Sequence, residues 1–240
     1  MSTQNNFFIN EYPFVHKKLP SVLGYFNRVI NKIGLNVYVG PDVHKEMSTK
    51  EQRMNFYLLA DSVINSNIPG DLVEMGSFTG QCALVFQKVI EQNNSNRVLH
   101  LYDSFESKFH ESGNIDDLLK KNFLKANLKL PVLHKGYFHE TLPLYLPSQV
   151  CFAHIDCGFG GDPVEHSKVV SCCLENVYPR MQKGAICMIM DYHDSEIENN
   201  DSRNTNPGAK LAVDSFLRDK PEVIRTLYGN QFSHAFFRKI

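Results

Sequence analysis

From Gly70 onward, short apolar segments alternate with segments of helical periodicity, and this alternation constrains the fold more than any other feature of the sequence. Strands separated by helices need crossover connections, which make consecutive strands parallel within one sheet. The apolar patterns predict strands at 71–75, 97–102, 131–135, 150–155 and 185–190, and helices at 81–91, about 119–127, 166–178 and 208–220. Two closing strands, at 223–227 and 233–238, are too close for a crossover and predict an antiparallel hairpin.

The 240 residues suffice for one well-buried α/β domain and are few for two. We expect a doubly wound, mostly parallel seven-stranded sheet within residues 51–240. Residues 1–50 are aromatic and interrupted by prolines and glycines, and are expected to form a helical lid on the substrate side. A helix over 48–65, capped by Ser48 or Thr49, leads into the core.

The net charge indicates which partners to expect, and the cysteine content indicates the redox environment. The net charge is −1 and the pI about 6.8, so no strong field favours nucleic acid or an anionic membrane. Neither a signal peptide nor a run of about 18 apolar residues is recognisable. The six cysteines form no C-x-x-C pair, which favours reduced, buried thiols. We therefore expect a cytoplasmic protein that acts on a small molecule.

The segment VEMGSFTG, residues 73–80, has the form of a ligand-binding turn between a strand and a helix. Glu74 ends the strand, Gly76 permits a tight turn, and Gly80 lets the following helix pack closely. A ligand could then reach the backbone N–H groups at the helix start. Phe78 stands where a dinucleotide site has its middle glycine, so it would crowd a pyrophosphate but tolerate an amino-acid tail. A plain strand–helix turn is the alternative.

Asp103 ends the next predicted strand, 23 residues after Gly80. An acid in this position can accept hydrogen bonds from both ribose hydroxyls of a nucleoside. An isolated aspartate at a strand end is more often a helix cap, but its spacing from the turn favours nucleoside binding.

Two further strand ends carry acids. Asp156 follows the fourth strand, and Asp191, His193 and Asp194 follow the fifth. Because the carboxyl ends of parallel strands line the ligand crevice, these groups are expected to lie near a substrate. They could deprotonate a hydroxyl, or their carboxylates could hold Mg²⁺. The alternative is that His193 and Asp194 are solvated loop residues.

The ordered motifs VEMGSFTG, YDSFES, KGYFHETLP, HIDC, CLENVYPR, KGAI, MDY and GAKLAVDSF resemble those of the macrocin and novobiocin-type O-methyltransferases. The preceding VHKEMSTKEQRMNFYLL is also similar, so the resemblance covers about residues 37–218. It implies a Rossmann-like class I fold that transfers the methyl group of S-adenosylmethionine to a hydroxyl, less readily an amine, of a small metabolite such as a sugar or natural product. It also implies a homo-oligomer.

Methyl transfer needs the removal of one proton, and Asp156 is the candidate general base, or a metal ligand if a cation binds, with Asp191 and His193 as supporting acceptors. The resemblance further implies which residues bind the cofactor. The expected cofactor-binding residues are Met47, Ser48, Glu74, Gly76, Phe78, Gly80, Asp103, Ser104, Phe105, Tyr137, Phe138 and Asp156.

In that family a divalent cation is held by the aspartate that matches Asp156 and by two consecutive aspartates after the fifth strand. Here Met190 precedes Asp191, and Gly158 replaces a usual acid. A thioether is a poor Mg²⁺ ligand, so metal binding at Asp156 and Asp191 would need help from His193 or Asp162.

Two other functions stay open at this point. A nicotinamide-dependent oxidoreductase could use the same opening strand and turn, although Phe78 counts against it. A non-catalytic partner subunit could keep the fold while Met190 and Gly158 replace functional groups.

Overall fold

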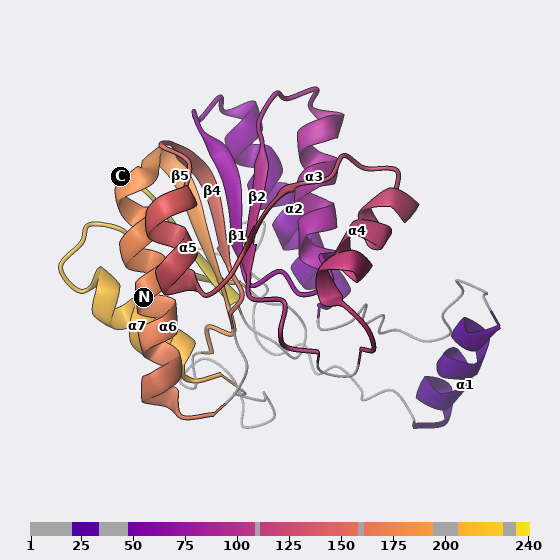
Figure 1. Cartoon of the computed structure of the whole chain (residues 1–240). Coiled ribbons are helices and arrows are strands. Elements are labelled where there is room, and N and C mark those ends of the chain that lie inside the picture. The colour runs from indigo at the N-terminus through magenta and orange to yellow at the C-terminus, as the bar shows by residue number, and fades with distance from the viewer. Residues whose placement is uncertain (1–20, 34–47, 109–110, 158–160, 194–205, 228–233) are drawn as a thin grey trace.

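The computed structural model describes residues 21–33, 48–108, 111–157, 161–193, 206–227 and 234–240. Its elements alternate as the sequence predicts (Figure 1). In chain order they are α1 (Ser21–Lys32), α2 (Lys50–Asn65), β1 (Asp71–Met75), α3 (Gln81–Gln92), β2 (Leu99–Asp103), α4 (Ile115–Lys125), β3 (Val132–Lys135), α5 (Phe138–Tyr145), β4 (Val150–Ile155), α6 (Pro163–Val177), a 3-10 turn (Tyr178–Arg180), β5 (Met181–Met190), α7 (Gly208–Leu217), β6 (Arg225–Leu227) and β7 (His234–Arg238).

The strands form one seven-stranded sheet in the order β3-β2-β1-β4-β5-β7-β6. Strands β1 to β5 are parallel, whereas β7 runs antiparallel to both β5 and β6. The strand order reverses between β1 and β4, where a doubly wound sheet opens its ligand crevice. Both the predicted parallel sheet and the closing antiparallel pair are confirmed.

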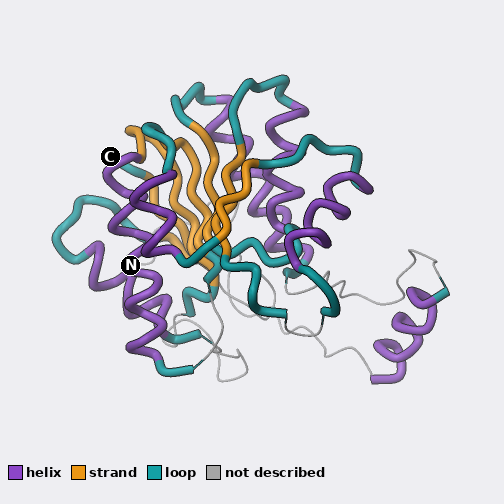
Figure 2. The backbone as a smooth tube through the Cα atoms, viewed as in Figure 1, coloured by secondary structure: helices purple, strands orange, loops and turns teal. Residues whose placement is uncertain are grey.

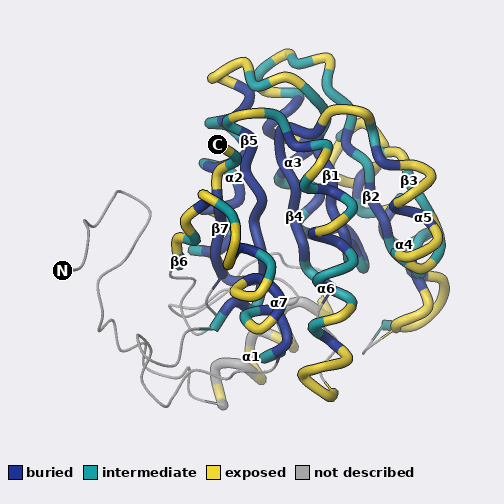
Figure 3. Tube along the Cα trace, turned by 90° about the vertical axis from the view of Figure 1, so that its left-hand side faces the viewer, coloured by how far each residue is buried: buried dark blue, intermediate teal, exposed yellow. Residues whose placement is uncertain are grey.

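Helices cover both faces of the sheet (Figure 2). On one face α2, α3 and α4 enclose a core that includes Phe56, Phe86 and Phe152. On the other face α5, α6 and α7 enclose a core that includes Tyr102 and Phe237. The central strands are buried (Figure 3), which explains why β4 shows no alternation of apolar and exposed polar residues.

The largest departures from the prediction are at β5 and α5. β5 begins at Met181 rather than 185, because its first residues pair with β4 ahead of a register shift and Gly184 adopts a positive φ of 86°. Helix α5 was not expected, since it has only eight residues and contains Pro143. Its first turn is closed by Glu140, whose carboxylate accepts a hydrogen bond from the Tyr137 N–H.

The predicted capping of α2 is confirmed at Thr49. The Thr49 hydroxyl accepts from the Gln52 N–H, and the Gln52 side chain accepts from the Thr49 N–H. All six cysteines are free thiols, and four of them are buried.

Helix α1 stands apart from the sheet and its covering helices in Figure 1. Residues 1–20 and 34–47 lie outside the described part, so the expected lid over residues 1–50 stays a prediction. Among the described helices, none combines the length and the apolar character needed to span a bilayer.

Candidate functional site

The turn after β1 is packed directly against the end of β4. Gly76 has a φ of 88°, and a Cβ atom on it would lie 2.0 Å from the backbone oxygen of Asp156. The Asp156 N–H donates to the Met75 carbonyl over 2.8 Å. Phe78 also has a positive φ, of 43°, which is strained for a bulky residue. Such strain is typical of turns shaped for ligand binding.

Asp103 connects the β1 turn to the loop that follows β2 through hydrogen bonds of its carboxylate. Its Oδ2 accepts from the backbone N–H groups of Ser77 and Phe78, at 2.8 and 2.9 Å. Its Oδ1 accepts from the Phe105 N–H at 2.7 Å. The structure therefore brings the predicted ribose-binding acid against the predicted cofactor turn, as a nucleoside site requires.

Glu74 points into the core beneath the turn. Its carboxylate is fully buried and lies 2.8 Å from Nδ1 of the equally buried His154 on β4. Burial raises the pKa of Glu74, although His154 opposes this shift. Within the described part, Glu74 Oε2 makes no hydrogen bond of good geometry, and the Ser77 hydroxyl lies close enough to the Glu74 carboxylate to help lower its pKa. This buried carboxylate oxygen fits a polar group of a ligand, such as an ammonium.

Asp156 and Asp191 meet at the ends of β4 and β5. Burial and the neighbouring carboxylates of Asp191, Glu74 and Asp103 raise the pKa of Asp156 well above its usual range. Burial also raises the pKa of Asp191, whose Oδ2 accepts from Asn206 Nδ2 over 2.6 Å. Four carboxylates thus gather at the carboxyl edge of the sheet, which suits a cationic ligand.

Sequence reasoning missed several polar neighbours of this acid pair. Asn206 precedes α7, and His166 on α6 lies close enough to Asp191 to favour its ionised form. Cys157 follows Asp156, and hydrogen bonding by Cys173, with help from His166, lowers the pKa of Cys157 to about 6. These contacts join residues far apart in the chain, so no local motif signals them.

The remaining predicted residues have varied surroundings. Ser48 and Phe105 are buried. Tyr137 is half exposed, and its hydroxyl donates to the Glu106 carboxylate at 2.7 Å. The Ser104 hydroxyl accepts from the Glu106 N–H. Phe138 opens α5 and packs on the core, and His193 is half-buried just before the undescribed residues 194–205. Met47, Gly158 and Asp194 lie outside the described residues.

The described residues do not make up a magnesium site. Met190 is buried in the core under α2, so it supplies a thioether where the resemblance implies a carboxylate. Asp162 caps α6 by accepting from the Val164 and Glu165 N–H groups. No cluster of three or more His, Cys, Asp or Glu side chains with metal-binding geometry occurs in the described ranges. Of the ligands that the resemblance implies, the described residues therefore supply two carboxylates, those of Asp156 and Asp191.

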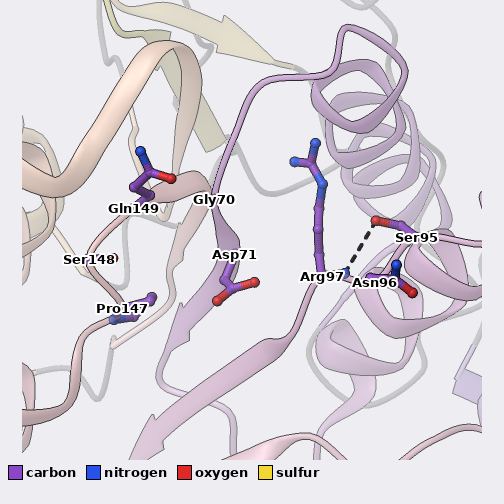
Figure 4. A pocket seen from close by; sticks show the side chains of 8 residues that line it. All are labelled: Gly70, Asp71, Ser95, Asn96, Arg97, Pro147, Ser148 and Gln149. Carbon is purple, nitrogen blue, oxygen red and sulfur yellow. Dashed lines mark hydrogen bonds between the residues drawn. The ribbon is translucent and has the colours of Figure 1, made fainter.

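A polar pocket of about 450 Å³ lies at the opposite edge of the sheet, where β1, β2 and β4 begin (Figure 4). Gly70, Arg97 and Gln149 line it beside Asp71, whose carboxylate accepts from the Val98 N–H. This pocket is therefore separate from the acids at the strands' carboxyl ends.

One family model matches part of the chain. Residues 31–132 match the family model described as Macrocin-O-methyltransferase (TylF). This stretch includes the predicted cofactor turn and Asp103, and the match confirms the predicted resemblance. No curated protein matches the chain.

Solved structures share the fold. The O-methyltransferase NovP superposes with a TM-score of 0.62 at 19% identity, covering 78% of this chain and 79% of NovP. CalS11, a TDP-rhamnose 3′-O-methyltransferase of calicheamicin biosynthesis, gives 0.55 at 20% identity, covering 78% and 80%. A Bacillus cereus O-methyltransferase in complex with SAH gives 0.56 at 14% identity, covering 94% and 93%. At such identities the likeness establishes the Rossmann-like fold.

Residues 31–132 are therefore similar to the macrocin O-methyltransferase family, and the chain has the Rossmann-like fold of solved O-methyltransferases.

Proposed function

We propose that the protein transfers a methyl group from S-adenosylmethionine to a hydroxyl of a small molecule such as a sugar or natural product. The observation that carries this proposal is the gathering of Glu74, Asp103, Asp156 and Asp191 around the strained Gly76–Phe78 turn. S-adenosylmethionine is a cationic nucleoside, and this edge of the sheet offers both a ribose acceptor and a set of anions.

Three groups would bind the cofactor. Asp103 would accept from the ribose hydroxyls through the lone pairs that its backbone contacts leave available. Glu74 Oε2 would accept from the ammonium of the amino-acid tail, because it is buried beside the turn without a described partner. Ser104, Phe105, Tyr137 and Phe138 would border the adenine, while Met47 and Ser48 would close the crevice.

When bound, the sulfonium supplies an electrophilic methyl group, so the chain has to position the acceptor and remove one proton. Asp156 would be the general base. Its raised pKa makes its ionised form a stronger base than an exposed carboxylate, which suits removal of a hydroxyl proton. Asp191, held by Asn206, and the nearby His193 would support the acceptor.

The proposed class of methyl acceptor is inferred from the solved structures that share the fold. CalS11 acts on TDP-rhamnose, so nucleotide-linked deoxysugars and glycosylated natural products are the acceptors to test first. The cytoplasmic location and homo-oligomeric state inferred from the sequence remain predictions.

The direct test is methyl transfer from methyl-labelled S-adenosylmethionine to a panel of nucleotide-linked and natural-product sugars. We expect labelling of a hydroxyl, lost in Asp156→Asn while the affinity for S-adenosylhomocysteine stays within about threefold of wild type. Because the thioether of buried Met190 stands where a carboxylate ligand is expected, EDTA should leave the rate unchanged.

Binding of NADH in place of S-adenosylmethionine would overturn the proposal in favour of an oxidoreductase. Tight cofactor binding with no transfer to any hydroxyl or amine would instead indicate a non-catalytic partner subunit.

A further inference from the structure

Helix α1 has one apolar face that the described chain leaves uncovered. Val22, Phe26, Val29 and Ile33 recur at intervals of three or four residues, so they lie along one side of the helix, with Tyr25 at its border. Between 40% and 73% of each of these five side chains is exposed. Below we call Val22, Tyr25, Phe26, Val29 and Ile33 the apolar stripe.

The stripe needs a covering surface. A helix of 12 residues is marginal by itself in water, because the cost of nucleation is spread over few hydrogen bonds. Most helical stability in proteins comes from burying an amphipathic face, and α1 stands apart from the layers that cover the sheet (Figure 1). Its partner therefore lies beyond the described core.

Charge identifies the chemistry of that partner. Arg28 and Lys32 are exposed on α1, and the helix has no acid. The bias extends along the chain, because residues 12–41 contain four Lys and Arg and no Asp or Glu. The net charge of −1 for the whole chain averages over this basic segment and conceals it.

We propose that α1 binds in the interface of an anionic lipid membrane, with the apolar stripe among the acyl chains and Arg28 and Lys32 at the phosphate groups. A short helix with a strong apolar face, a basic polar face and low overall hydrophobicity is typical of interfacial binding. This departs from the expectation that the whole-chain charge gives no reason for membrane contact, and it is independent of the proposed methyl transfer.

A second copy of the chain is a less favourable partner for the apolar stripe than an anionic membrane. Pairing α1 with α1 would juxtapose like charges, since the helix has no acid to meet Arg28 and Lys32. The other exposed large apolar side chains are dispersed over several elements, including Met54 on α2, Leu124 on α4 and Leu211 on α7. Scattered side chains of this kind are ordinary and form no matching groove.

Vesicle flotation of the full chain tests the proposal. Vesicles of phosphatidylcholine mixed with phosphatidylglycerol should bind the protein, whereas vesicles of phosphatidylcholine alone should bind it far less, and added salt should weaken the binding. The Arg28→Gln/Lys32→Gln variant should partition about 30-fold more weakly, at about fivefold for each cation lost. The Phe26→Ser variant should also bind anionic vesicles more weakly, because it removes a large apolar side chain from the apolar stripe.

Two controls match these variants elsewhere on the surface. Lys121→Gln/Lys125→Gln removes two exposed cations from α4, and Leu144→Ser removes an exposed apolar side chain from α5. Both should bind anionic vesicles as wild type does. All four variants should keep wild-type affinity for S-adenosylhomocysteine, which separates this proposal from the methyltransferase assignment.

Several outcomes would overturn the proposal. The protein could fail to bind anionic vesicles, the α4 variant could lose as much binding as the α1 variant, or zwitterionic vesicles could bind equally well. Sedimentation velocity showing a dimer that Phe26→Ser dissociates, without vesicle binding, would identify a second copy as the partner. A fall in the transfer rate of the α1 variants, with no vesicle binding in wild type, would support the lid.

Discussion

Asp156 connects the geometry of the site to a measurable pH dependence. Burial and three neighbouring carboxylates raise its pKa well above the usual range, so Asp156 keeps its proton to a higher pH than an exposed aspartate does. A cation bound among these acids stabilises their ionised forms. Binding should therefore release protons, and the ionised site should bind the cofactor more tightly.

The expected result is that the affinity for S-adenosylmethionine increases as the pH rises through the raised pKa of Asp156. The increase should be at most about tenfold per pH unit for each proton released. S-adenosylhomocysteine lacks the sulfonium charge, so its affinity should change less. Calorimetry in buffers of different ionisation heat measures both the affinity and the protons released. Equal, pH-independent affinities for the two ligands would contradict this account.

Gly76 allows a stringent test of the cofactor turn. Gly76→Ala would place a Cβ against the Asp156 backbone oxygen and also strain a positive φ. Gly113 has a similar φ, of 96°, but a Cβ there would meet no described atom within 4 Å. We expect Gly113→Ala to lower the unfolding free energy by about 1–2 kcal/mol, the cost of left-handed backbone in a non-glycine residue.

Gly76→Ala should cost about 3 kcal/mol or more and abolish binding of S-adenosylhomocysteine, because β1 and β4 must separate. Urea denaturation and calorimetry measure the two effects. Equal losses of stability in both variants would mean that the close approach of Gly76 to Asp156 contributes nothing.

At the scale of elements, the Glu74–His154 pair joins β1 to β4 inside the core. Its partners are 80 residues apart, and the rings of Phe56 and Phe86 lie 5.2 and 5.1 Å from the His154 ring. A buried polar pair is costly to break but can be replaced as a unit. A double-mutant cycle therefore separates its structural role from its role at the site.

Glu74→Leu should lower the unfolding free energy by about 1–3 kcal/mol, because it leaves His154 buried without its carboxylate partner. Adding His154→Phe, which suits the two neighbouring aromatic rings, should return the stability to within about 1 kcal/mol of wild type. Cofactor affinity should stay low in the double variant if Glu74 binds the ammonium. Recovery of affinity together with stability would restrict Glu74 to a structural role.

For the whole molecule, the sequence predicted what local pattern determines. The alternation of short apolar segments with helical periodicity predicted the parallel strands, and the spacing from the β1 turn to Asp103 predicted that both would lie at one edge of the sheet. The contact between Asp103 and the Ser77 and Phe78 N–H groups is consistent with that reasoning.

Contacts that depend on register or on short irregular elements could not be predicted. The pairing of Glu74 with His154 follows from the alignment of β1 with β4, which no local signal specifies. Helix α5 was not predicted, because it is short and contains Pro143, so its sequence shows no clear helical periodicity. Asn206 lies beside Asp191 only because a long connection returns the chain to the end of β5.

The central claim is that this edge of the sheet binds an adenosyl cofactor, and one calorimetric comparison tests it most directly. Titration of the full chain with S-adenosylhomocysteine should show one site per chain. Asp103→Ala should weaken that affinity about 10- to 100-fold through loss of charge-assisted hydrogen bonds, while Asp61→Ala, which removes the α2 carboxylate that accepts from Asn65 and Asn93, should not. No binding by wild type, or equal binding by wild type and Asp103→Ala, would contradict the account.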